Sequence, residues 1–419
     1  MISIKNYNFY IFNFIFCFFP ISLILGNQAT NLNLALICFY ALLLYPKKIF
    51  LINFNFFDKL LILFFLYSLI VLLINYAEYS FFLNSNIFPK LIIHKTIFYF
   101  RYLILYFVLR FLLNEKILKI KYFYLICALS VTTVSIDIII QFIFGKNIIG
   151  LTPYTNKHYS GLFGNELIAG GYILKFYSTL LIIILPILLN FKKNNFLIYI
   201  FLILFFLFAI ILSGNRMPLI LYLLSIIFFL FLFKNYRKYF IKFFLIISLF
   251  LIILLNINHK FKENYLTFYF YSKKLIEVFV ASDLKNPTND MLTLPYMGEF
   301  YCAKIMIGKN PVIGGGIRSY RTHDNGCNTH PHNYYLEIIS ELGVLGLIMI
   351  LVFVYSLLFN SIKLYPKYSF QVIPPVIFIL IEFFPIRSSG SFFSTNNASI
   401  IFIFFAILVS LIVNKSNKV

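Results

Sequence analysis

The sequence contains no tryptophan and only five cysteines, and charged residues make up only 12% of it. Soluble globular proteins carry about 25% charged residues, so this scarcity of charge excludes that class. Hydrophobic residues make up 61% of the chain. They come in runs of about membrane-spanning length, separated by short polar breaks. The composition therefore predicts an all-α polytopic integral membrane protein.

Several functional signatures are also absent. No G-x-x-x-x-G-K-[ST] loop occurs, so ATP hydrolysis is not supported, and no D-x-D pair indicates a metal-bound nucleotide-sugar site. The chain has no basic stripe with interleaved exposed aromatics and no nucleic-acid motif. We therefore attribute the net charge of +21 to membrane topology. We expect no nucleic-acid partner and no cofactor.

The cysteines fall into two groups. Cys17, Cys38 and Cys127 lie inside apolar runs and are interpreted as small core residues. Cys302 and Cys327 lie in a long polar loop, where a disulfide between them is one option if the loop is outside the cytoplasm.

The apolar runs predict about twelve membrane spans and a single membrane domain. The first 25 residues lack a small-x-small cleavage pattern, so we interpret them as a first span rather than a removed signal. The second and eleventh spans are short, so either is expected to be tilted, broken or re-entrant. The spans run near 9–25, 31–46, 60–76, 97–113, 122–144, 167–189, 196–212, 217–233, 240–256, 334–358, 371–386 and 398–413.

The positive charges predict the orientation of these spans. Most lysines and arginines of the short loops fall on the side of the N-terminus, which the positive-inside rule places in the cytoplasm. An even number of spans then leaves both termini inside. Residues 1–256 hold nine spans, residues 257–333 form one large loop outside the cytoplasm, and residues 334–419 hold three spans. The segment from Phe300 to Ile307 within the loop is expected to be helical and to end at Asn310-Pro311.

Ionisable residues near the membrane lean toward the outer side. In this topology all six histidines fall in outside loops. Charges at bilayer depth are costly and mark functional cavities, so we expect a polar cavity open to the outer face. The charged residues that lean outward are Arg101, Asp137, Lys175, Arg216, Glu382 and Arg387.

Two histidines stand directly before the tenth span. Pro331 disfavours helix at His330, and Asn333 is a good N-cap, so the span is expected to begin after His332. Asn333 and Glu337 are therefore expected to start and position this helix.

Three interpretations of the histidine pair stay open. The two rings only cap the helix, or they bind zinc together with His323 and Asp324, or a neutral imidazole acts as general base on a hydroxyl. The zinc interpretation is not favoured by the sequence, because no helical H-x-x-x-H or cysteine pair fixes the geometry.

Three arginines are candidate anion ligands. Arg216 lies in the tight outside turn from Ser213 to Pro218, where its guanidinium suits either a diphosphate or a lipid headgroup. Arg318 and Arg321 follow the glycines at 314–316, whose amides could bind an anion together with them. A glycine turn with two solvated arginines is the commoner explanation of such a segment.

These segments together resemble the O-antigen ligase and polymerase family. Within Asn310–Gly316 the family pattern P-x-x-G-x-G matches Pro311–Gly316, and within His330–Glu337 the pattern H-N-x-x-L-[QE] matches His332–Glu337. A glycine-rich start of the next span matches Glu341–Gly346. Fainter similarities lie at Ser160–Glu166 and Ser213–Arg216. The family-like core spans about residues 160–350.

The resemblance implies a metal-independent, inverting membrane glycosyltransferase of lipopolysaccharide biosynthesis in the bacterial inner membrane. Its donor would be a glycan linked to undecaprenyl diphosphate, and its acceptor lipid A–core in a ligase or a second lipid-linked repeat in a polymerase. Membrane lipids would be its other partners, and its active site would lie on the periplasmic side. By the resemblance His332 would be the family's histidine before asparagine and Arg216 its turn arginine. Our hypothesis for the mechanism uses His332 as the base with His330 as orienter or substitute base, and Arg216 with Arg318 or Arg321 to bind the diphosphate.

One position departs from the family pattern. Members often carry an arginine ahead of the P-x-x-G-x-G segment, near Tyr296–Glu299, and this chain has none there. Arg318 or Arg321 is expected to supply that charge.

Two other classes stay open beside the transferase. A transporter or flippase would line a path with Arg101, Asp137, Lys175 and Glu382, but the chain shows no internal repeat of the kind common in transporters. A membrane scaffold would bind the lipid-linked sugar without reaction. Between ligase and polymerase, the short fifth-to-sixth loop near 145–166 favours ligase, because polymerases resemble a pattern with two large loops.

Overall fold

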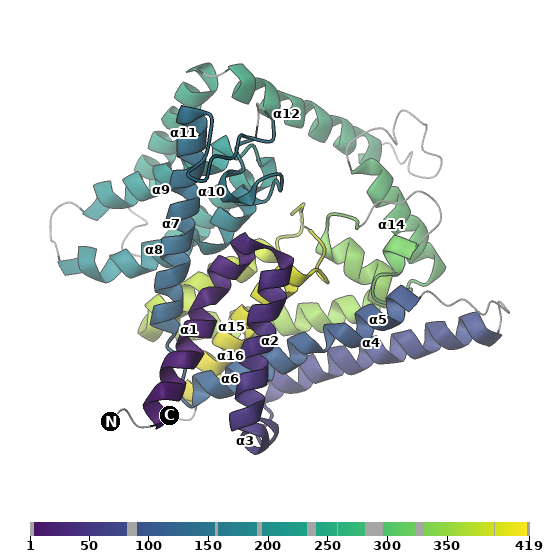
Figure 1. Cartoon of the computed structure of the whole chain (residues 1–419). Helices are drawn as coiled ribbons and strands as arrows, with labels where there is room; N and C mark the ends of the chain where they lie inside the picture. The colour runs from purple at the N-terminus through teal and green to yellow at the C-terminus, as the bar shows by residue number, and fades with distance from the viewer. Residues whose placement is uncertain are drawn as a thin grey trace. The chain divides into compact units, whose positions relative to one another are not determined.

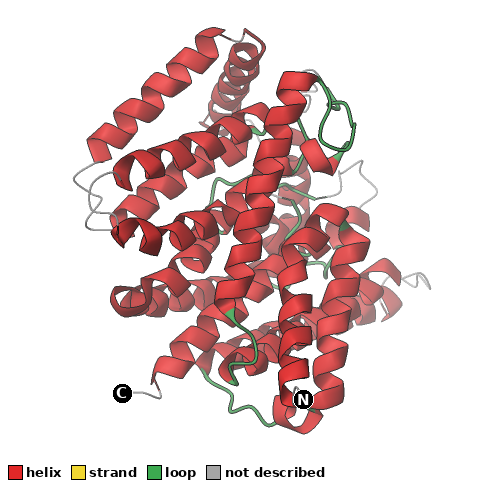
Figure 2. Cartoon of the chain, turned by 60° about the vertical axis from the view of Figure 1, so that its left-hand side comes forward, coloured by secondary structure: helices red, strands yellow, loops and turns green. Residues whose placement is uncertain are grey.

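The computed structural model describes residues 4–81, 90–155, 158–190, 195–232, 240–257, 259–280, 296–322, 330–388 and 390–416. Among these residues helices joined by loops make up the fold, and the only β pairing is an isolated bridge between Thr155 and His158 (Figure 2). The predicted all-α class is confirmed.

The chain divides into two compact units. Unit 1 comprises Met1–Ala29, Lys119–Lys273 and Tyr368–Glu382, and unit 2 comprises Thr30–Leu118, Lys274–Lys367 and Phe383–Val419. Unit 1 holds α1 (Ile4–Leu25), α7 (Ile120–Phe144), η1 (Gly161–Phe163), α8 (Ala169–Asn190), α9 (Asn195–Leu212), α10 (Arg216–Leu232) and α11 (Phe240–Ile257). Within it α7 packs against α1, α8 and α9.

Unit 2 contains the other elements, apart from those that pass from one unit to the other. It holds α3 (Pro46–Phe50), α4 (Phe56–Phe81), α5 (Lys90–Tyr99), α6 (Arg101–Asn114), α14 (Met297–Lys309), η4 (Ser319–Thr322) and α16 (Thr395–Ser416). Within it α6 packs against α16, and α4 lies beside α5 (Figure 1). Three helices have residues in both units: α2 (Asn27–Leu44), α12 (His259–Val280) and α15 (Tyr334–Glu382).

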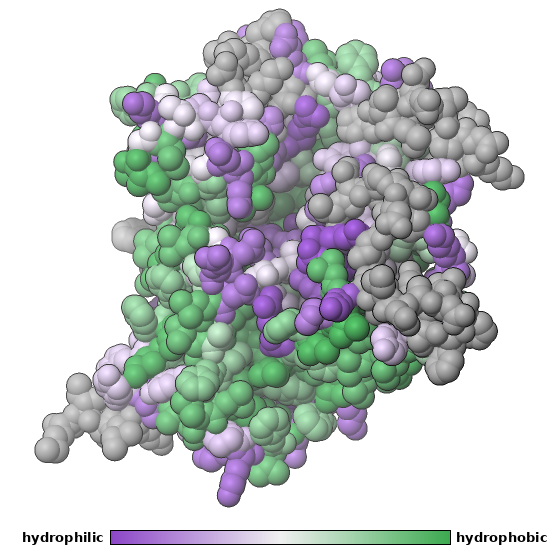
Figure 3. Space-filling view, turned by 45° about the vertical axis from the view of Figure 1, so that its right-hand side comes forward, coloured by the Kyte–Doolittle hydropathy of each residue, from purple (hydrophilic) through white to green (hydrophobic). Residues whose placement is uncertain are grey.

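The helices are long and apolar enough for a membrane protein. Seven of them qualify as candidate membrane spans within the described residues, and four further apolar helices are shorter. The predicted spans coincide largely with helices, but the one near 97–113 is divided between α5 and α6, and the one near 371–386 extends past the end of α15 at Glu382. The predicted number of about twelve spans stays a prediction. Large apolar side chains such as Phe14, Phe39 and Ile104 are exposed. Hydrophobic side chains also cover broad areas of the surface in the space-filling view (Figure 3). Soluble proteins rarely expose such areas, whereas lipid-facing helices do.

The element α15 folds back on itself. A straight helix of its 49 residues would be about 74 Å long. However, the Asn333 side-chain amide donates to the Pro385 carbonyl at 2.8 Å, and the Tyr335 hydroxyl donates to the Phe383 carbonyl at 2.5 Å. The residues that flank the two ends therefore meet. The span predicted near 334–358 lies in the first part of α15, and the one predicted near 371–386 begins in its last part and extends past Glu382.

The loop predicted over residues 257–333 contains two helices of its own, α12 and α14. The helix predicted at Phe300–Ile307 is the middle of α14, which ends at Asn310 directly before Pro311, as expected from the restriction on residues before proline. Cys302, on α14, is disulfide-bonded. Its suggested partner Cys327 lies outside the described residues.

A buried ion pair anchors one end of unit 2. Arg110 on α6 is 2% exposed and Asp58 on α4 is fully buried, and the two side chains form a salt bridge. The Tyr106 hydroxyl donates to Asp58 at 2.7 Å, and Arg110 also donates to the Asn53 carbonyl at 3.1 Å. These bonds compensate for the desolvation of both charges and tie the segment before α4 to α6.

We predict that Asp58→Ala lowers stability by about 3–5 kcal/mol, because it leaves the Arg110 cation buried without its counter-ion. The measurement is thermal unfolding of the purified protein in detergent. The double variant Asp58→Leu with Arg110→Met removes both charges and should be less destabilised than Asp58→Ala. Equal losses in the single and double variants would contradict the pairing.

Candidate functional site

The histidine pair lies directly before the first turn of α15. Asn333 caps this helix, since its side-chain oxygen accepts from the backbone N–H groups of Tyr335 at 2.9 Å and Leu336 at 3.2 Å. The ring centroids of His330 and His332 are 4.2 Å apart. The structure therefore places the two imidazoles side by side at the mouth of an apolar helix.

Three residues around this pair adopt the left-handed backbone region, which is uncommon for residues other than glycine. They are Tyr296 (φ 67°), Arg318 (φ 79°) and His332 (φ 52°). The Tyr296 ring packs edge-on against His332 with centroids 5.0 Å apart. Tyr296 thus stands next to His332. Such conformations cluster at functional sites, where they fix side-chain directions.

His330 is held as a neutral ring. It is half-buried, and burial together with the neighbouring charges of His332 and Arg321 lowers the pKa of His330 to about 4. A ring with this pKa is a weak base at neutral pH, so His332 is the better candidate for proton transfer within the pair.

We predict that His330 stays neutral down to about pH 5 and protonates near pH 4, because its pKa is lowered to about 4. The measurement is the pH dependence of its imidazole signals by NMR. Between about pH 6.5 and pH 4 the unfolded chain binds a proton that the folded chain does not. The wild type should therefore lose stability relative to His330→Gln as the pH falls through this window. A protonation midpoint of His330 near pH 6.5 in the NMR titration would contradict the burial of the ring.

The glycine-rich loop, residues 311–316, packs against α15 where that helix is broken at Gly343. Gly343 adopts φ +66° inside the helix, so the carbonyls before it and the amides after it lack their usual helical partners. The loop supplies new ones: Gly315 N–H donates to the Ser340 carbonyl at 3.1 Å and Gly316 N–H to the Glu341 carbonyl at 2.7 Å. In return Val344 N–H donates to the Pro311 carbonyl at 2.9 Å.

Side chains of α4 also donate hydrogen bonds to backbone carbonyls at the junction between the glycine-rich loop and α15. The Tyr67 hydroxyl donates to the Leu342 carbonyl at 3.0 Å, and Asn75 donates to the Gly314 carbonyl at 3.1 Å. Gly314 and Gly343 leave no room for a side chain, because a Cβ on Gly343 would lie 2.1 Å from the Val312 carbonyl oxygen and one on Gly314 would lie 2.5 Å from backbone atoms of α15.

The expectation that the triple glycine offers its amides to an anion is therefore wrong. Gly314 N–H donates to the Asn310 carbonyl at 2.9 Å, and the amides of Gly315 and Gly316 pair with α15. The expectation of close backbone approach is correct, but the partner is protein backbone rather than a ligand. The physical reason is that a broken helix must find partners for its freed polar groups.

We predict that Gly343→Ala destabilises the protein by roughly 2–4 kcal/mol, because the added methyl meets backbone at a strained φ. Thermal unfolding of the purified protein measures the loss. Gly308→Ala is the matched control, since Gly308 lies in α14 with open space around it. Alanine favours helix over glycine by about 1 kcal/mol, so the control should be neutral or stabilised. Wild-type stability of Gly343→Ala would show that the junction is not closely packed.

The docked loop carries Arg318 and Arg321 to a cluster of charged residues in unit 2. Burial and the nearby Arg321 lower the pKa of Arg318, while Glu341 opposes this shift. Lys95 of α5 interacts electrostatically with Arg318, Arg321, Arg101 and Glu341. The cluster therefore comprises four cations, contributed by α5, α6 and the loop, beside the first turns of α15.

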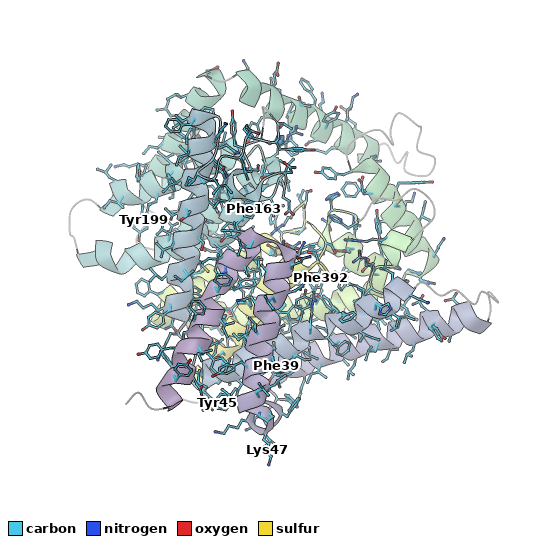
Figure 4. All side chains as sticks on the ribbon, in the orientation of Figure 1. Phe39, Tyr45, Lys47, Phe163, Tyr199 and Phe392 are labelled. Carbon is cyan, nitrogen blue, oxygen red and sulfur yellow. The ribbon has the colours of Figure 1, made fainter. Side chains whose placement is uncertain are left out.

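Two buried carboxylates on α15 accompany these cations. Glu337 is 3% exposed and accepts from the Ser391 hydroxyl at 2.5 Å and the Phe392 backbone N–H at 2.6 Å. Phe392, labelled in Figure 4, packs edge-on against Tyr334. Glu341 is 2% exposed, and one of its oxygens is buried without a hydrogen-bond partner among the described residues. Glu337 thus holds the segment before α16 against the start of α15.

Sequence reasoning missed Lys95 and Glu341 as site residues and did not connect Arg101 with the loop arginines. Lys95 looked like a topological charge because it stands near the start of an apolar run. A signal was present nonetheless: Glu337 and Glu341 are four residues apart on one helix face, and Lys95 stands just before the predicted span near 97–113 that contains Arg101.

Arg216 belongs to unit 1, where it is the first residue of α10. Its guanidinium lies over the Phe268 ring of α12 at 5.8 Å, and it also interacts with Tyr265. Aromatic rings stabilise a cation placed over them, so these contacts orient Arg216 at the turn between α9 and α10.

Asp137, also in unit 1, has a structural role in the described chain. Its carboxylate accepts from the Ile148 N–H at 2.8 Å, from the Asn147 amide at 3.3 Å and from the backbone of Leu162. These bonds hold the segment between α7 and α8, including η1 with Phe163 (Figure 4). The transporter interpretation counted Asp137 among path-lining residues, whereas here its acceptor sites are used within the fold.

The zinc interpretation needs His323 and Asp324, which lie outside the described residues. Within the described ranges no group of three or more His, Cys, Asp or Glu side chains gathers for a metal. The arrangement around His330 and His332 suits acid–base chemistry beside an anion, because a neutral imidazole stands next to an excess of positive charge.

Comparison with known proteins agrees with the sequence motifs. Residues 198–351 match the model of the O-antigen ligase family. This range contains Arg216, the docked loop, both histidines and the broken start of α15. No curated protein matches the chain significantly. The family match confirms the resemblance, and it indicates a function of the O-antigen ligase or polymerase type with a lipid-linked glycan and an acceptor as partners. Over residues 198–351 the chain is thus similar to the O-antigen ligase family.

Proposed function

We propose that the protein transfers a glycan from undecaprenyl diphosphate to a hydroxyl of lipid A–core on the periplasmic face of the inner membrane. The observation that carries this proposal is the convergence, in unit 2, of the histidine pair and four cations at the start of an apolar helix. A lipid-linked diphosphate needs such a place, because its chain lies in the bilayer and its anion at the interface.

The chemistry is an inverting displacement without a metal. The acceptor oxygen attacks the anomeric carbon, the bond from that carbon to the diphosphate oxygen breaks, and its electron pair leaves with undecaprenyl diphosphate. His332 takes the proton of the acceptor hydroxyl, and His330, neutral and 4.2 Å away between ring centroids, orients it. Arg318 and Arg321 stabilise the negative charge that grows on the leaving group.

The acceptor separates a ligase from a polymerase, which uses a second lipid-linked repeat. The segment between α7 and α8 favours the ligase, because it is short and bonded back onto Asp137 rather than forming a second large outer loop. The same bonds weaken the transporter alternative, since they occupy a carboxylate that a transport path would use.

We predict that His332→Ala lowers the rate of glycan transfer by about 10²–10⁴-fold, because the general base is lost. The assay uses purified protein in nanodiscs with a lipid-linked glycan donor, and either lipid A–core or a second lipid-linked repeat as acceptor. Arg318→Gln should also lower the rate of glycan transfer, because it removes a positive charge that stabilises the leaving diphosphate. His158→Ala, a histidine of unit 1, is the matched control and should keep the wild-type rate.

Different outcomes decide between the alternatives. Product on lipid A–core supports the ligase, and product only on the second lipid-linked repeat would make the protein a polymerase. Unchanged transfer in both His332→Ala and Arg318→Gln would remove the proposed mechanism. Counterflow of the donor across the membrane without product would indicate a transporter, and donor binding without release of the carrier would indicate a scaffold.

A further inference from the structure

The glycine-rich loop brings Arg318 against the first turns of α5. A Cβ placed on Gly316 would lie 3.0 Å from Cγ2 of Ile92, so the loop backbone packs closely on α5 at that residue. Lys95 follows Ile92 by one helical turn, and Arg318 follows Gly316 by two residues. Lys95 is therefore held on the side of α5 where the loop delivers its arginines.

Arg101 reaches the same charged cluster from the first residue of α6. Its guanidinium donates to the Tyr102 hydroxyl at 2.7 Å and to the Thr395 hydroxyl at 3.1 Å. Its Nε atom is buried and has no hydrogen-bond partner among the described residues. The two hydroxyls thus fix the orientation of Arg101 and leave one of its donors unused.

Further unpaired polar atoms lie in the same part of unit 2. The hydroxyl of Tyr99, which is 1% exposed, one oxygen of Glu341 and the Nε atom of Arg318 are all buried without partners within the described part of the chain. Tyr99 interacts electrostatically with both Glu341 and Arg101. Buried polar groups are ordinarily paired, so several unpaired ones together indicate a place for a polar molecule.

The charges of the cluster determine which molecule fits. Lys95, Arg101, Arg318 and Arg321 face two carboxylates, Glu337 and Glu341, so among the described residues of the cluster the cations outnumber the carboxylates by two. Glu337 is moreover occupied by Ser391 and Phe392. Like charges in a poorly solvated site repel, and a bound anion relieves that repulsion.

We propose that Lys95 and Arg101 bind the diphosphate of the donor together with Arg318 and Arg321, so that α5 and α6 form one wall of the anion site. A diphosphate matches the excess of positive charge and offers several acceptor oxygens to guanidinium and ammonium donors. The assignment of the anion to a lipid-linked donor rests on the proposed function, whereas the anion class follows from the charges alone.

Binding of inorganic diphosphate to the purified full-length protein, measured by calorimetry, tests this proposal. Lys95→Gln and Arg101→Gln should each weaken binding by about tenfold or more, because each removes a charge-assisted contact. Lys90→Gln is the matched control, since Lys90 is exposed at the start of the same helix, and it should bind as the wild type does. Lys95→Arg keeps the charge and should restore most of the affinity.

The contrary outcomes are equally specific. Wild-type affinity in both Lys95→Gln and Arg101→Gln, or no binding by the wild type, would overturn the proposal. Thermal unfolding of each variant separates weakened binding from misfolding, and Arg101→Lys provides a folded comparison if Arg101→Gln unfolds. His332→Ala should bind diphosphate normally while losing transfer. Failure of the transfer chemistry would therefore be seen separately from failure of this anion site.

Discussion

The break in α15 at Gly343 is the constraint on which the rest of the site in unit 2 depends. A membrane helix that loses its own hydrogen bonds must find others, because lipid offers none. The loop at 311–316 supplies them, and Tyr67 and Asn75 complete the set. This packing fixes the position of the C-terminal end of the loop. Arg318 and Arg321, which follow it, therefore lie beside the charged residues of α5, α6 and α15.

The electrostatics of the cluster follow from that geometry. Positive charges held together in a poorly solvated region are costly unless an anion joins them, and this cost is the basis of the anion site that we propose. The neutral state of His330 arises from the same surroundings, because the charge of Arg321 and burial both oppose its protonation. One packing arrangement therefore sets both the anion preference and the protonation of the histidine beside His332.

Much of this could be predicted from the sequence, and the remainder depends on contacts distant along the chain. Apolar runs predicted the helices, Asn333 was recognised as an N-cap, and Asn310-Pro311 marked the end of α14, because these are local effects. The use of the glycine amides could not be predicted, since their partners lie about 25 residues further on in α15. Lys95 and Glu341 were missed for the same reason: only tertiary packing shows that they share a site with Arg318.

The central claim is that the docked loop and the histidine pair of unit 2 meet the donor diphosphate outside the cytoplasm. The most direct test is labelling of single cysteines by a membrane-impermeant maleimide in spheroplasts. Lys309→Cys, exposed at the end of α14, should be labelled from outside, whereas Lys47→Cys, exposed in α3 (Figure 4), should be labelled only after lysis. Labelling of Lys309→Cys only after lysis would place the loop in the cytosol, away from a periplasmic acceptor, and would contradict the account.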